Sequence, residues 1–418
     1  MELEMKRVLC FVLLPALFLL TSSYALTQDT VELRFLCFED DNECEVYADL
    51  LAQFSEINPE IKVAVDVTAE EDMFARLQAA YDADAAYDIA RAKRGWMQGI
   101  YVDLRPLLGE ALTAHFRPVY FDFLRVLPDD RGIYAFPDAL GVVAPFVNVS
   151  LFEQAGVTLP GEGASWDEWL AALDEVVSAT EASYALSVDN KDHRLVSPAM
   201  SLGAEYFDED GALTLPDADG LRAFLQILHE LMEAGKTPSD TLLGTGKSQD
   251  YFVRGETVMY ICGSWKVEEV AEQVGDEFEW AIVANPSGPA GGTGVAQATM
   301  LVAYEDTNES EAVAKVFAYL LGAEVSAEFA ARTLTIPARE DLAASGIDYE
   351  TDDEAIAVAL NAFAREVPKL QDQAIVLDLH PLAAEYYAAS NELLRAYFAG
   401  ELTLDEALAG LQARLGGA

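Results

Sequence analysis

The sequence predicts an α/β protein with two lobes, and two observations lead to this fold class. Segments typical of strands and segments typical of helices alternate from residue 31 onward, which indicates a parallel sheet with helices on both faces. The chain has 418 residues, 52% of them hydrophobic, which is long for a single hydrophobic core and suits two. The sequence contains no obvious flexible linker, so we expect the lobes to be joined by more than one passage of the chain.

The first elements follow from hydrophobic periodicity. Apolar and polar residues alternate over residues 31–36, which predicts a strand, and apolar residues recur at helical spacing over residues 44–57. A second strand is predicted at residues 61–67, a second helix at 70–81 and a third strand at 87–90. The chain therefore opens in the order β-α-β-α-β.

Local signals mark the later elements. Residues 141–147 form an apolar run that predicts a strand, and the acidic cluster at 208–211 ends in glycine and predicts a hairpin turn. Ser165 is followed three residues later by Glu168, which is the spacing of a capping box. We therefore expect a helix over residues 166–180. The C-terminal part of the chain has a helical pattern throughout.

Residues 1–25 have the pattern of an export signal. Lys6-Arg7 precede an apolar run from Val8 to Leu20, and Ser23-Tyr24-Ala25 offers small residues at both cleavage-recognition positions. The apolar run is shorter than the roughly 20 residues that a membrane-spanning helix needs, which favours a cleaved signal over a membrane anchor. The sequence thus predicts secretion to the periplasm or another extracytoplasmic space.

The chain is strongly acidic. It contains 72 Asp and Glu residues against 26 Lys and Arg residues, which gives a formal net charge of -46. Such a charge repels nucleic acid and anionic lipid surfaces, so neither is an expected partner. We expect the acidic residues to form a heavily solvated surface, suited to a saline habitat.

The cysteines leave one question open. Cys37 and Cys44 are close enough in sequence to form a disulfide after export, and two free buried thiols fit the same spacing. Cys262 lies within an apolar strand, where we expect a thiol in the core.

No pattern in the sequence predicts catalysis or metal binding. The four histidines are scattered without the spacing of metal ligands, and neither a Gly-x-Ser-x-Gly elbow nor a His-Glu-x-x-His pair occurs. Carboxylates are so abundant that a pair of them carries no information about a catalytic acid and base. We therefore expect a protein without enzymatic activity, cofactor or metal, which captures a ligand instead.

The most informative segment is residues 251–265, in which a Gly255-Glu256 turn precedes an apolar strand and a Gly263-Ser264-Trp265 tip. Further motifs follow one another along the chain. They are Phe54-Ser55-Glu56-Ile57-Asn58-Pro59, Tyr87-Asp88-Ile89, Gly132 to Pro137 followed by Phe146-Val147-Asn148, Ser165-Trp166-Asp167-Glu168, and Leu334-Thr335-Ile336-Pro337-Ala338-Arg339. In this order the motifs resemble those of the family 1 extracellular solute-binding proteins, which include maltodextrin-binding and other sugar-binding proteins of ABC importers.

This resemblance implies a two-lobed periplasmic-binding-protein fold of type II with a hinge of several segments. The lobes are then discontinuous in sequence. Residues 26–137 and 286–334 form the N-terminal lobe, and residues 138–285 and 335–418 form the C-terminal lobe. Each lobe is expected to hold a mainly parallel sheet flanked by helices, with the ligand in the cleft beyond the strand ends.

The resemblance also implies a function. The protein is expected to be an extracytoplasmic receptor that binds a carbohydrate between its lobes and delivers it to the transmembrane subunits of an ABC permease. We expect a monomer that closes over its ligand. Another ligand, such as a sugar phosphate, a sugar acid or a polyamine, is an alternative, and the basic cluster Arg91-Ala92-Lys93-Arg94 favours an anionic one. A secreted carbohydrate-active enzyme is a third hypothesis, which no motif supports.

A sugar site needs aromatic platforms and charged or polar groups, and four side chains at expected strand ends fit this need. Trp265, beside two small residues, is expected to stack on the ligand or to pack in the core. Arg91 and Lys93 are expected to bind ligand oxygens or to pair with neighbouring acids. Trp96 follows this basic cluster.

The other candidates are polar residues near the expected crossings between the lobes. Asp40 and Asp41 lie in the loop after the first strand, where the family commonly places a polar contact. Asp138 lies near the crossing into the second lobe, and Asn190 follows a strand-like segment. Arg332 lies in the late segment that resembles the return crossing.

Overall fold

The computed structural model describes most of the chain. The described residues are 30–39, 41–83, 85–93, 101–122, 125, 130–304 and 307–415. The predicted export signal, residues 1–25, lies outside them. Among the described residues, no helix is both long and apolar enough to span a bilayer.

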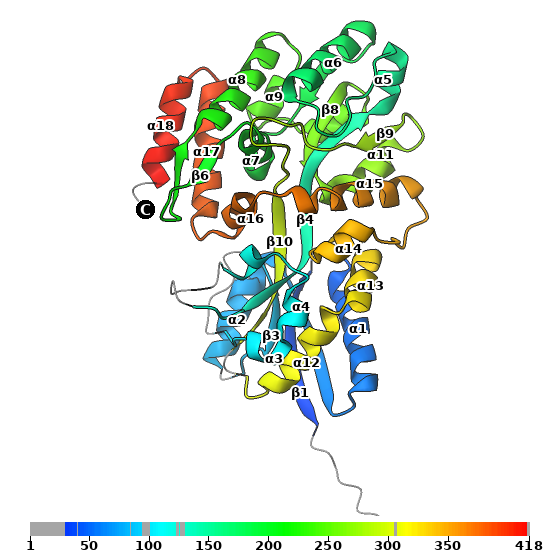
Figure 1. Cartoon of the computed structure of the whole chain (residues 1–418), viewed down its shortest axis with the longest axis vertical. Helices are drawn as coiled ribbons and strands as arrows, with labels where there is room; N and C mark the ends of the chain where they lie inside the picture. Colours follow the sequence, from blue (N-terminus) through cyan, green and yellow to red (C-terminus); the bar gives the residue numbers. More distant parts are fainter. Residues whose placement is uncertain are drawn as a thin grey trace, which may run out of the picture.

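Two lobes are stacked along the long axis of the molecule, with a narrower region between them (Figure 1). The lower lobe in this view holds the first elements and a later group of helices. Its elements are β1 (Val31–Glu39), α1 (Glu43–Ile57), β2 (Ile61–Ala69), the 3-10 helix η1 (Glu70–Asp72), α2 (Met73–Asp82), β3 (Ile89–Ala92), α3 (Arg105–Leu108), α4 (Glu110–Thr113), η2 (Pro118–Phe121), β10 (Ala296–Ala303), α12 (Ser310–Leu320), α13 (Ala323–Thr333), β11 (Ile336–Pro337) and α14 (Glu340–Ser345).

The upper lobe holds the middle of the chain and its C-terminal helices. Its elements are α5 (Val149–Ala155), α6 (Trp166–Ala179), β5 (Tyr184–Ser187), α7 (Asp192–Ser201), β6 (Glu205–Phe207), β7 (Leu213–Asp217), α8 (Asp219–Glu233), α9 (Ser239–Leu242), α10 (Ser248–Val253), β8 (Thr257–Gly263), η3 (Ser264–Lys266), α11 (Val267–Val274), β9 (Trp280–Ile282), α15 (Glu354–Ala364), η4 (Val367–Lys369), α16 (Asp372–Leu379), α17 (Ala383–Phe398) and α18 (Leu404–Leu415).

The main sheet runs through both lobes in the order β2-β1-β3-β10-β4-β8-β5. β1 pairs in parallel with β2 and β3, and β5 pairs in parallel with β8, as βαβ connections require. In the lower lobe, α2 lies on the opposite side of the sheet from α1 (Figure 1). The predicted β-α-β-α-β opening and the two-lobed α/β fold are therefore confirmed. Antiparallel pairs occur where β10 lies between β3 and β4.

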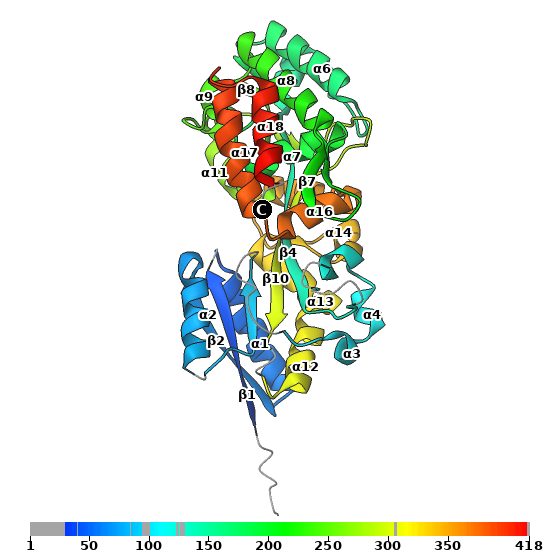
Figure 2. The ribbon, with the colours of Figure 1, turned by 90° about the vertical axis from the view of Figure 1, so that its left-hand side faces the viewer.

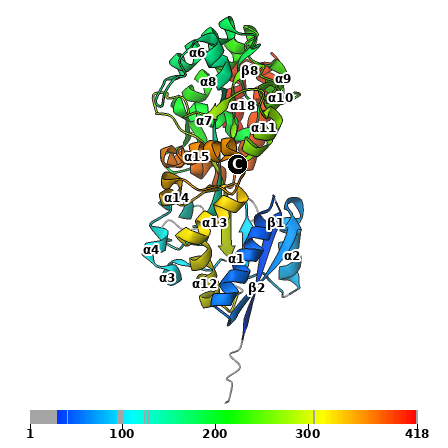
Figure 3. The same ribbon diagram turned by 90° about the vertical axis from the view of Figure 1, so that its right-hand side faces the viewer.

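The strand β4 (Ala135–Asn148) belongs to both lobes. It pairs with β10 up to Val142 and with β8 and β9 from Val143 onward. Figure 2 shows β4 and β10 in the region between the lobes, and Figure 3 shows the two stacked lobes from the opposite side. The predicted strand at 141–147 covers only the second half of β4. In the first half Pro137 is followed by the charged Asp138, which interrupts the apolar run, so the sequence pattern is weak there.

The chain passes between the lobes more than once, as predicted. It goes up along β4, returns into β10, and passes up again between α13 and α15 (Figure 1). The residues at which the lobes begin and end in the sequence stay a prediction.

The buried hydrophobic residues form two cores. One core contains Phe35, Phe54 and Leu301 under α1 and α12, and it continues across β4 into the upper lobe as far as Phe363 of α15. The other core lies in the upper lobe and contains Trp169 of α6 together with apolar residues of α7, α8, α17 and α18. The first core therefore extends through the region between the lobes.

Two local predictions in the upper lobe are confirmed. The backbone amide of Ser165 donates to Glu168 Oε2 at 2.8 Å, and Ser165 Oγ accepts from the amide of Glu168 at 3.3 Å, so the capping box is complete. The hairpin between β6 and β7 turns at residues 208–211, and Gly211 has a φ of 82° that an L side chain would rarely adopt.

The structure resolves the question of the cysteines. Cys37, in β1, and Cys44, in the first turn of α1, form a disulfide with their Cα atoms 5.8 Å apart. Cys262 is a free, buried thiol in β8, as expected. The disulfide ties the end of β1 to the start of α1, and so fixes the ends of the loop between them.

Candidate functional site

A cleft of about 480 Å³ lies between the two lobes. Side chains from α1, β3 and the segment after α13 line it from the lower lobe. Side chains from α7 and η3 line it from the upper lobe, and β4 and β10 supply its floor. β3 and β8 both end at this cleft, which is the edge at which α/β sheets bind ligands.

Trp265 lies at the end of β8 and lines the cleft. Its side chain is 40% exposed, which is unusual for an indole and makes its ring accessible to a ligand. One edge contacts His193 of α7, whose ring centroid is 5.0 Å away at an interplanar angle of 79°. The ring therefore forms part of the cleft surface and is not packed inside the core.

Two glycines make room for this indole. A β-carbon placed on Gly263 would lie 2.0 Å from the Trp265 ring, and one on Gly141 would lie 2.8 Å from it. The ring thus lies directly on the backbone of β8 and of β4, where a larger residue would displace it. Sequence reasoning identified Trp265 and its glycine neighbour, but Gly141 comes from a separate strand and had no signal of its own.

Arg91 lies at the lower side of the cleft in a buried ionic cluster. Its Nη2 donates to Glu43 Oε1 at 3.1 Å, and its Nε donates to Asp138 Oδ2 at 3.2 Å. Tyr47 Oη donates to the same Asp138 oxygen at 2.7 Å. Burial alone would lower the pKa of Arg91, but attraction to Asp138 and Glu43 outweighs it and raises that pKa. The guanidinium is thus held in place by two carboxylates.

Lys93, two residues after Arg91, also lines the cleft. Its Nζ lies 2.9 Å from Glu70 Oε2 and 4.9 Å from the centroid of the Phe38 ring. Arg91 and Lys93 were expected to bind ligand oxygens or to pair with acids. Both pair with acids and both line the cleft, so each has part of its charge already neutralised.

The first turn of α7 lines the cleft from the upper lobe with Lys191, His193 and Arg194. Arg194 donates from Nη1 to Asp189 Oδ2, and Asp189 Oδ1 accepts from the amide of Ser248 at 2.8 Å. Sequence reasoning missed this turn, although it chose the neighbouring Asn190. Two cations within four residues, in a chain so poor in cations, are the signal that could have found it.

The floor of the cleft is polar but uncharged. Gln297 and Thr299 of β10 line it, together with Ser264 of η3 and Thr335. Ser264 Oγ accepts from the amide of Val142 at 3.2 Å, which ties η3 to the crossing strand. Amide and hydroxyl groups that surround an exposed indole suit a ligand with both apolar faces and many hydroxyl groups.

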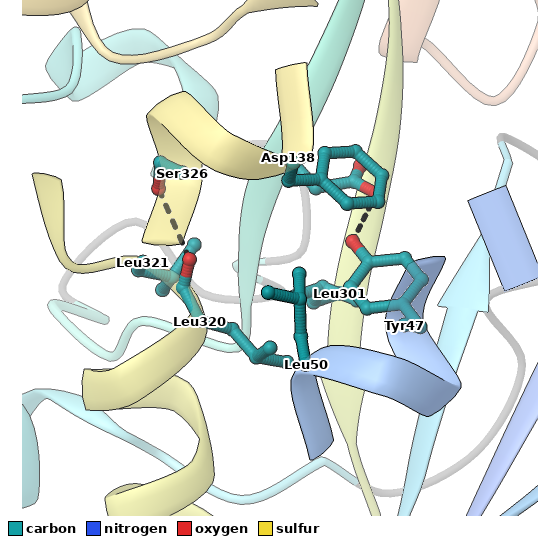
Figure 4. Close-up of a pocket in the computed structure, with 8 residues that line it drawn as sticks. Tyr47, Leu50, Asp138, Leu301, Leu320, Leu321 and Ser326 are labelled. Atoms are coloured by element: carbon teal, nitrogen blue, oxygen red, sulfur yellow. Dashed lines mark hydrogen bonds between the residues drawn. The ribbon is translucent and has the colours of Figure 1, made fainter. Parts of the chain in front are cut away.

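Asp138 does not line the cleft, although the sequence made it a candidate contact. It borders a separate cavity of about 10 Å³, together with Tyr47 and Leu301. Figure 4 shows Asp138 accepting from Tyr47 beside this cavity. Asp138 therefore binds Arg91 on the side away from the cleft.

Two further candidates, Asn190 and Arg332, lie away from the cleft lining. Asn190 is buried and donates from Nδ2 to the carbonyl oxygen of Asn391 at 3.3 Å. Arg332 pairs with Asp49 and Glu328 on the helix surface. Their ligand contacts stay predictions.

Candidates in the loop after β1 and after β3 are placed only in part. Asp41 is exposed, and its backbone amide donates to Glu43 Oε2 at 2.8 Å. Asp40 and Trp96 lie outside the described residues. Among the residues that the structure describes, no group of His, Cys, Asp and Glu side chains is arranged to hold a metal ion.

Comparisons with known proteins agree on one family. A family model described as bacterial extracellular solute-binding protein matches residues 45–327. No curated protein sequence matches the chain. Three similar solved structures are the sugar-binding protein MalE from Xanthomonas citri, the cyclic alpha-maltosyl-1,6-maltose binding protein from Arthrobacter globiformis, and a cyclo/maltodextrin-binding protein in complex with maltotetraose.

The likeness to these structures extends over nearly the whole chain. The Xanthomonas protein has a TM-score of 0.76 at 21% identity, covering 92% of this chain and 96% of its own. The Arthrobacter protein has a TM-score of 0.74 at 18% identity, covering 93% and 98%. The maltotetraose complex has a TM-score of 0.72 at 16% identity, covering 92% and 96%. These identities establish the shared fold, and because the family model spans more than half of the sequence, the chain belongs to the bacterial extracellular solute-binding proteins.

Proposed function

We propose that this protein is the extracytoplasmic receptor of an ABC importer, which binds a carbohydrate in the cleft and delivers it to a membrane permease. The single observation that carries this proposal is the exposed Trp265 ring, which lies on Gly141 and Gly263 in a polar cleft of about 480 Å³. The similar solved structures are of sugar-binding proteins, which supports the same ligand class.

The chemistry of the cleft suits a saccharide. A pyranose ring has apolar C–H faces that stack on an indole, and hydroxyl groups around its edge that bind amides, hydroxyls and charged groups. Trp265 provides the platform, and Gln297 and Thr299 provide uncharged polar groups on the floor. A polyamine is less suited, because the described lining has a single carboxylate, Glu43, which already binds Arg91.

Delivery follows from the way the lobes are joined. Residues of both lobes line the cleft, so a ligand that contacts both stabilises the closed arrangement. A permease that recognises surfaces of both lobes would then distinguish the loaded from the empty receptor. We propose that the protein does this as a monomer, after export and removal of residues 1–25, and that it releases its ligand unchanged.

A thermal-shift screen tests the ligand class. The panel contains neutral oligosaccharides such as maltotetraose, sugar acids, sugar phosphates and polyamines. A ligand at 100 times its dissociation constant stabilises the folded state by about 2.7 kcal/mol, which gives a clear increase in melting temperature. If a polyamine alone stabilised the protein, or if a glycan were cut instead of bound, the proposal would be wrong.

Replacement of Trp265 tests the site. We expect Trp265→Ala to weaken binding of the best panel ligand about tenfold or more, because it removes one stacking platform. The melting temperature of the free protein should change little, since the ring is partly exposed. Trp280→Ala, at a ring stacked on Phe146 outside the cleft, is the matched control and should lower stability without lowering affinity. Unchanged affinity in Trp265→Ala would assign the indole to packing.

A further inference from the structure

The charge of the cleft is opposite to that of the chain. The whole sequence has 72 acidic and 26 basic residues. The described cleft lining has four basic residues, Arg91, Lys93, Lys191 and Arg194, and one acidic residue, Glu43. A distribution governed only by the acidic composition would give the reverse. The lining therefore carries information about the charge of the ligand.

The basic residues of the lower lobe are largely neutralised. Arg91 is 1% exposed and binds two carboxylates, those of Glu43 and Asp138. Lys93 pairs with Glu70. Three acids therefore contact two bases on this side of the cleft, so it offers a ligand no net positive charge.

The first turn of α7, in the upper lobe, carries a basic residue that is not neutralised in this way. Lys191 is exposed in the cleft, and no carboxylate lies within ion-pair distance of it among the described residues. Arg194 is only 7% exposed, and its Nε has no hydrogen-bond partner in the described structure. The carboxylate of Asp189 balances the charge of Arg194, so Lys191 is the cation without a carboxylate partner among the described side chains of this turn.

The helix itself adds to this positive potential. α7 begins at Asp192 without a side-chain cap, so the amide groups of its first turn point toward the cleft end. A helix N-terminus attracts anions and disfavours cations. The N-terminus of α7 therefore favours an anion on the side of the cleft where Lys191 lies.

The position of this turn relative to the indole defines what the anion is attached to. His193, between the two cations, contacts Trp265 edge-on at a centroid distance of 5.0 Å. The start of α7 and the stacking platform are thus neighbours in the same cleft. The same molecule can stack on Trp265 and place a charged substituent at Lys191.

We propose that the ligand is an acidic saccharide, whose oxyanion binds Lys191, the Nε of Arg194 and the first turn of α7 while a sugar ring stacks on Trp265. This inference rests on the proposed function and specifies its ligand class. A carboxylate, a sulfate ester and a phosphate ester share the required chemistry, which is a hydrogen-bond-accepting oxyanion.

Calorimetry with matched pairs tests the charge requirement. Uronate oligosaccharides of the gluco, galacto and manno series are each compared with their fully methyl-esterified, neutral forms, and hexose 6-sulfates and 6-phosphates with the parent hexoses. We expect at least one acidic member to bind about tenfold tighter than its neutral partner, or more, and this preference to weaken as salt is added. The pair that binds best identifies which oxyanion is used.

The outcomes separate the two proposals. If a neutral saccharide binds as well as or better than every acidic one, the acidic ligand is excluded while the carbohydrate receptor stands. If no saccharide of either kind binds, the carbohydrate receptor fails as well.

A charge substitution locates the anion. Lys191→Ala should lower affinity for the acidic saccharide about tenfold, reduce the salt dependence, and leave affinity for the neutral ester unchanged. Lys62→Ala, at an exposed lysine of β2 outside the cleft, makes the same change in net charge and should alter neither. Equal effects of the two substitutions would overturn the proposed position of the anion.

Discussion

At the scale of single residues, the cleft depends on the absence of a side chain at Gly263 as much as on the indole of Trp265. Gly263 has a φ of -107° and a ψ of 167°, which any residue adopts, so its backbone does not require glycine. The requirement comes from the Trp265 ring, which occupies the space of a side chain. Glycine is therefore needed at this position for contact with the indole and not for the fold of the strand.

Gly263→Ala should separate these two roles. The added methyl group cannot coexist with the Trp265 ring in its present position, so we expect the ring to move and ligand affinity to fall about tenfold. Gly161→Ala is the control, because a β-carbon there meets no atom within 4 Å. Titration calorimetry of both variants checks this. A Gly263→Ala variant with unchanged affinity would show that the ring can shift without loss of stacking.

Arg91→Met should destabilise the protein, because it removes the cation from the buried cluster of Arg91, Glu43 and Asp138. The substitution leaves Glu43 and Asp138 buried without their cation, which costs about 3 kcal/mol in the free energy of unfolding. Arg222→Met breaks an exposed pair with Asp405 and should cost less than about 1 kcal/mol. Urea unfolding of the two variants measures both values. Equal losses in the free energy of unfolding would mean that the buried ion pairs of Arg91 contribute no more to stability than the exposed pair of Arg222.

At the scale of elements, the sequence predicted what local patterns encode. The helix opened by Ser165 was located to its first residue, because a capping box is a local signal. The two halves of β4 were not joined in the prediction, because the strand changes partner at Val142 and only tertiary contacts show this. The cations at the start of α7 were missed although they lie close together in sequence, because their place at the cleft depends on how α7 packs.

The disulfide acts on the loop between β1 and α1. The double variant Cys37→Ala and Cys44→Ala should lose about 2 kcal/mol in the free energy of unfolding, because the unfolded chain has more conformational entropy without the cross-link. Reductant should lower the stability of the native protein and leave the double variant unaffected. Cys262→Ala retains the disulfide, so its stability should still fall when reductant is added. Unfolding curves with and without reductant test this, and a double variant as stable as the native protein would contradict it.

At the scale of the whole molecule, like charges face each other across the cleft. Burial raises the pKa of Glu268, in α11 of the upper lobe, and the carboxylate of Asp41 in the lower lobe raises it further. The two carboxylates therefore repel each other between the lobes, and this repulsion is weaker when Glu268 is protonated.

The pH dependence of Glu268→Gln follows from this. A raised pKa in the folded state means that the carboxyl group favours folding fully below its ordinary value of about 4.3, and that this contribution is lost as pH rises through the raised value. The variant should therefore gain stability relative to the native protein as pH increases from about 4 to 7. Glu272→Gln, one turn further along the same helix and likewise exposed, makes the same change in charge and is the control. Melting temperatures of the native protein and the variants from about pH 4 to 7 test this. If the curve of Glu268→Gln ran parallel to that of the native protein, Glu268 would have no role in the pH dependence of stability.

The change of partner in β4 links ligand and hinge mechanically. Gly141, on which the indole rests, is one residue before the point where β4 leaves the sheet of the lower lobe for that of the upper lobe. Ser264, next to Trp265, is hydrogen-bonded to this same point at Val142. Any twist of β4 between the lobes must therefore tilt the indole. The difference in fluorescence between the native protein and Trp265→Ala, which removes the signal of the other four tryptophans, should therefore report lobe closure without an added label.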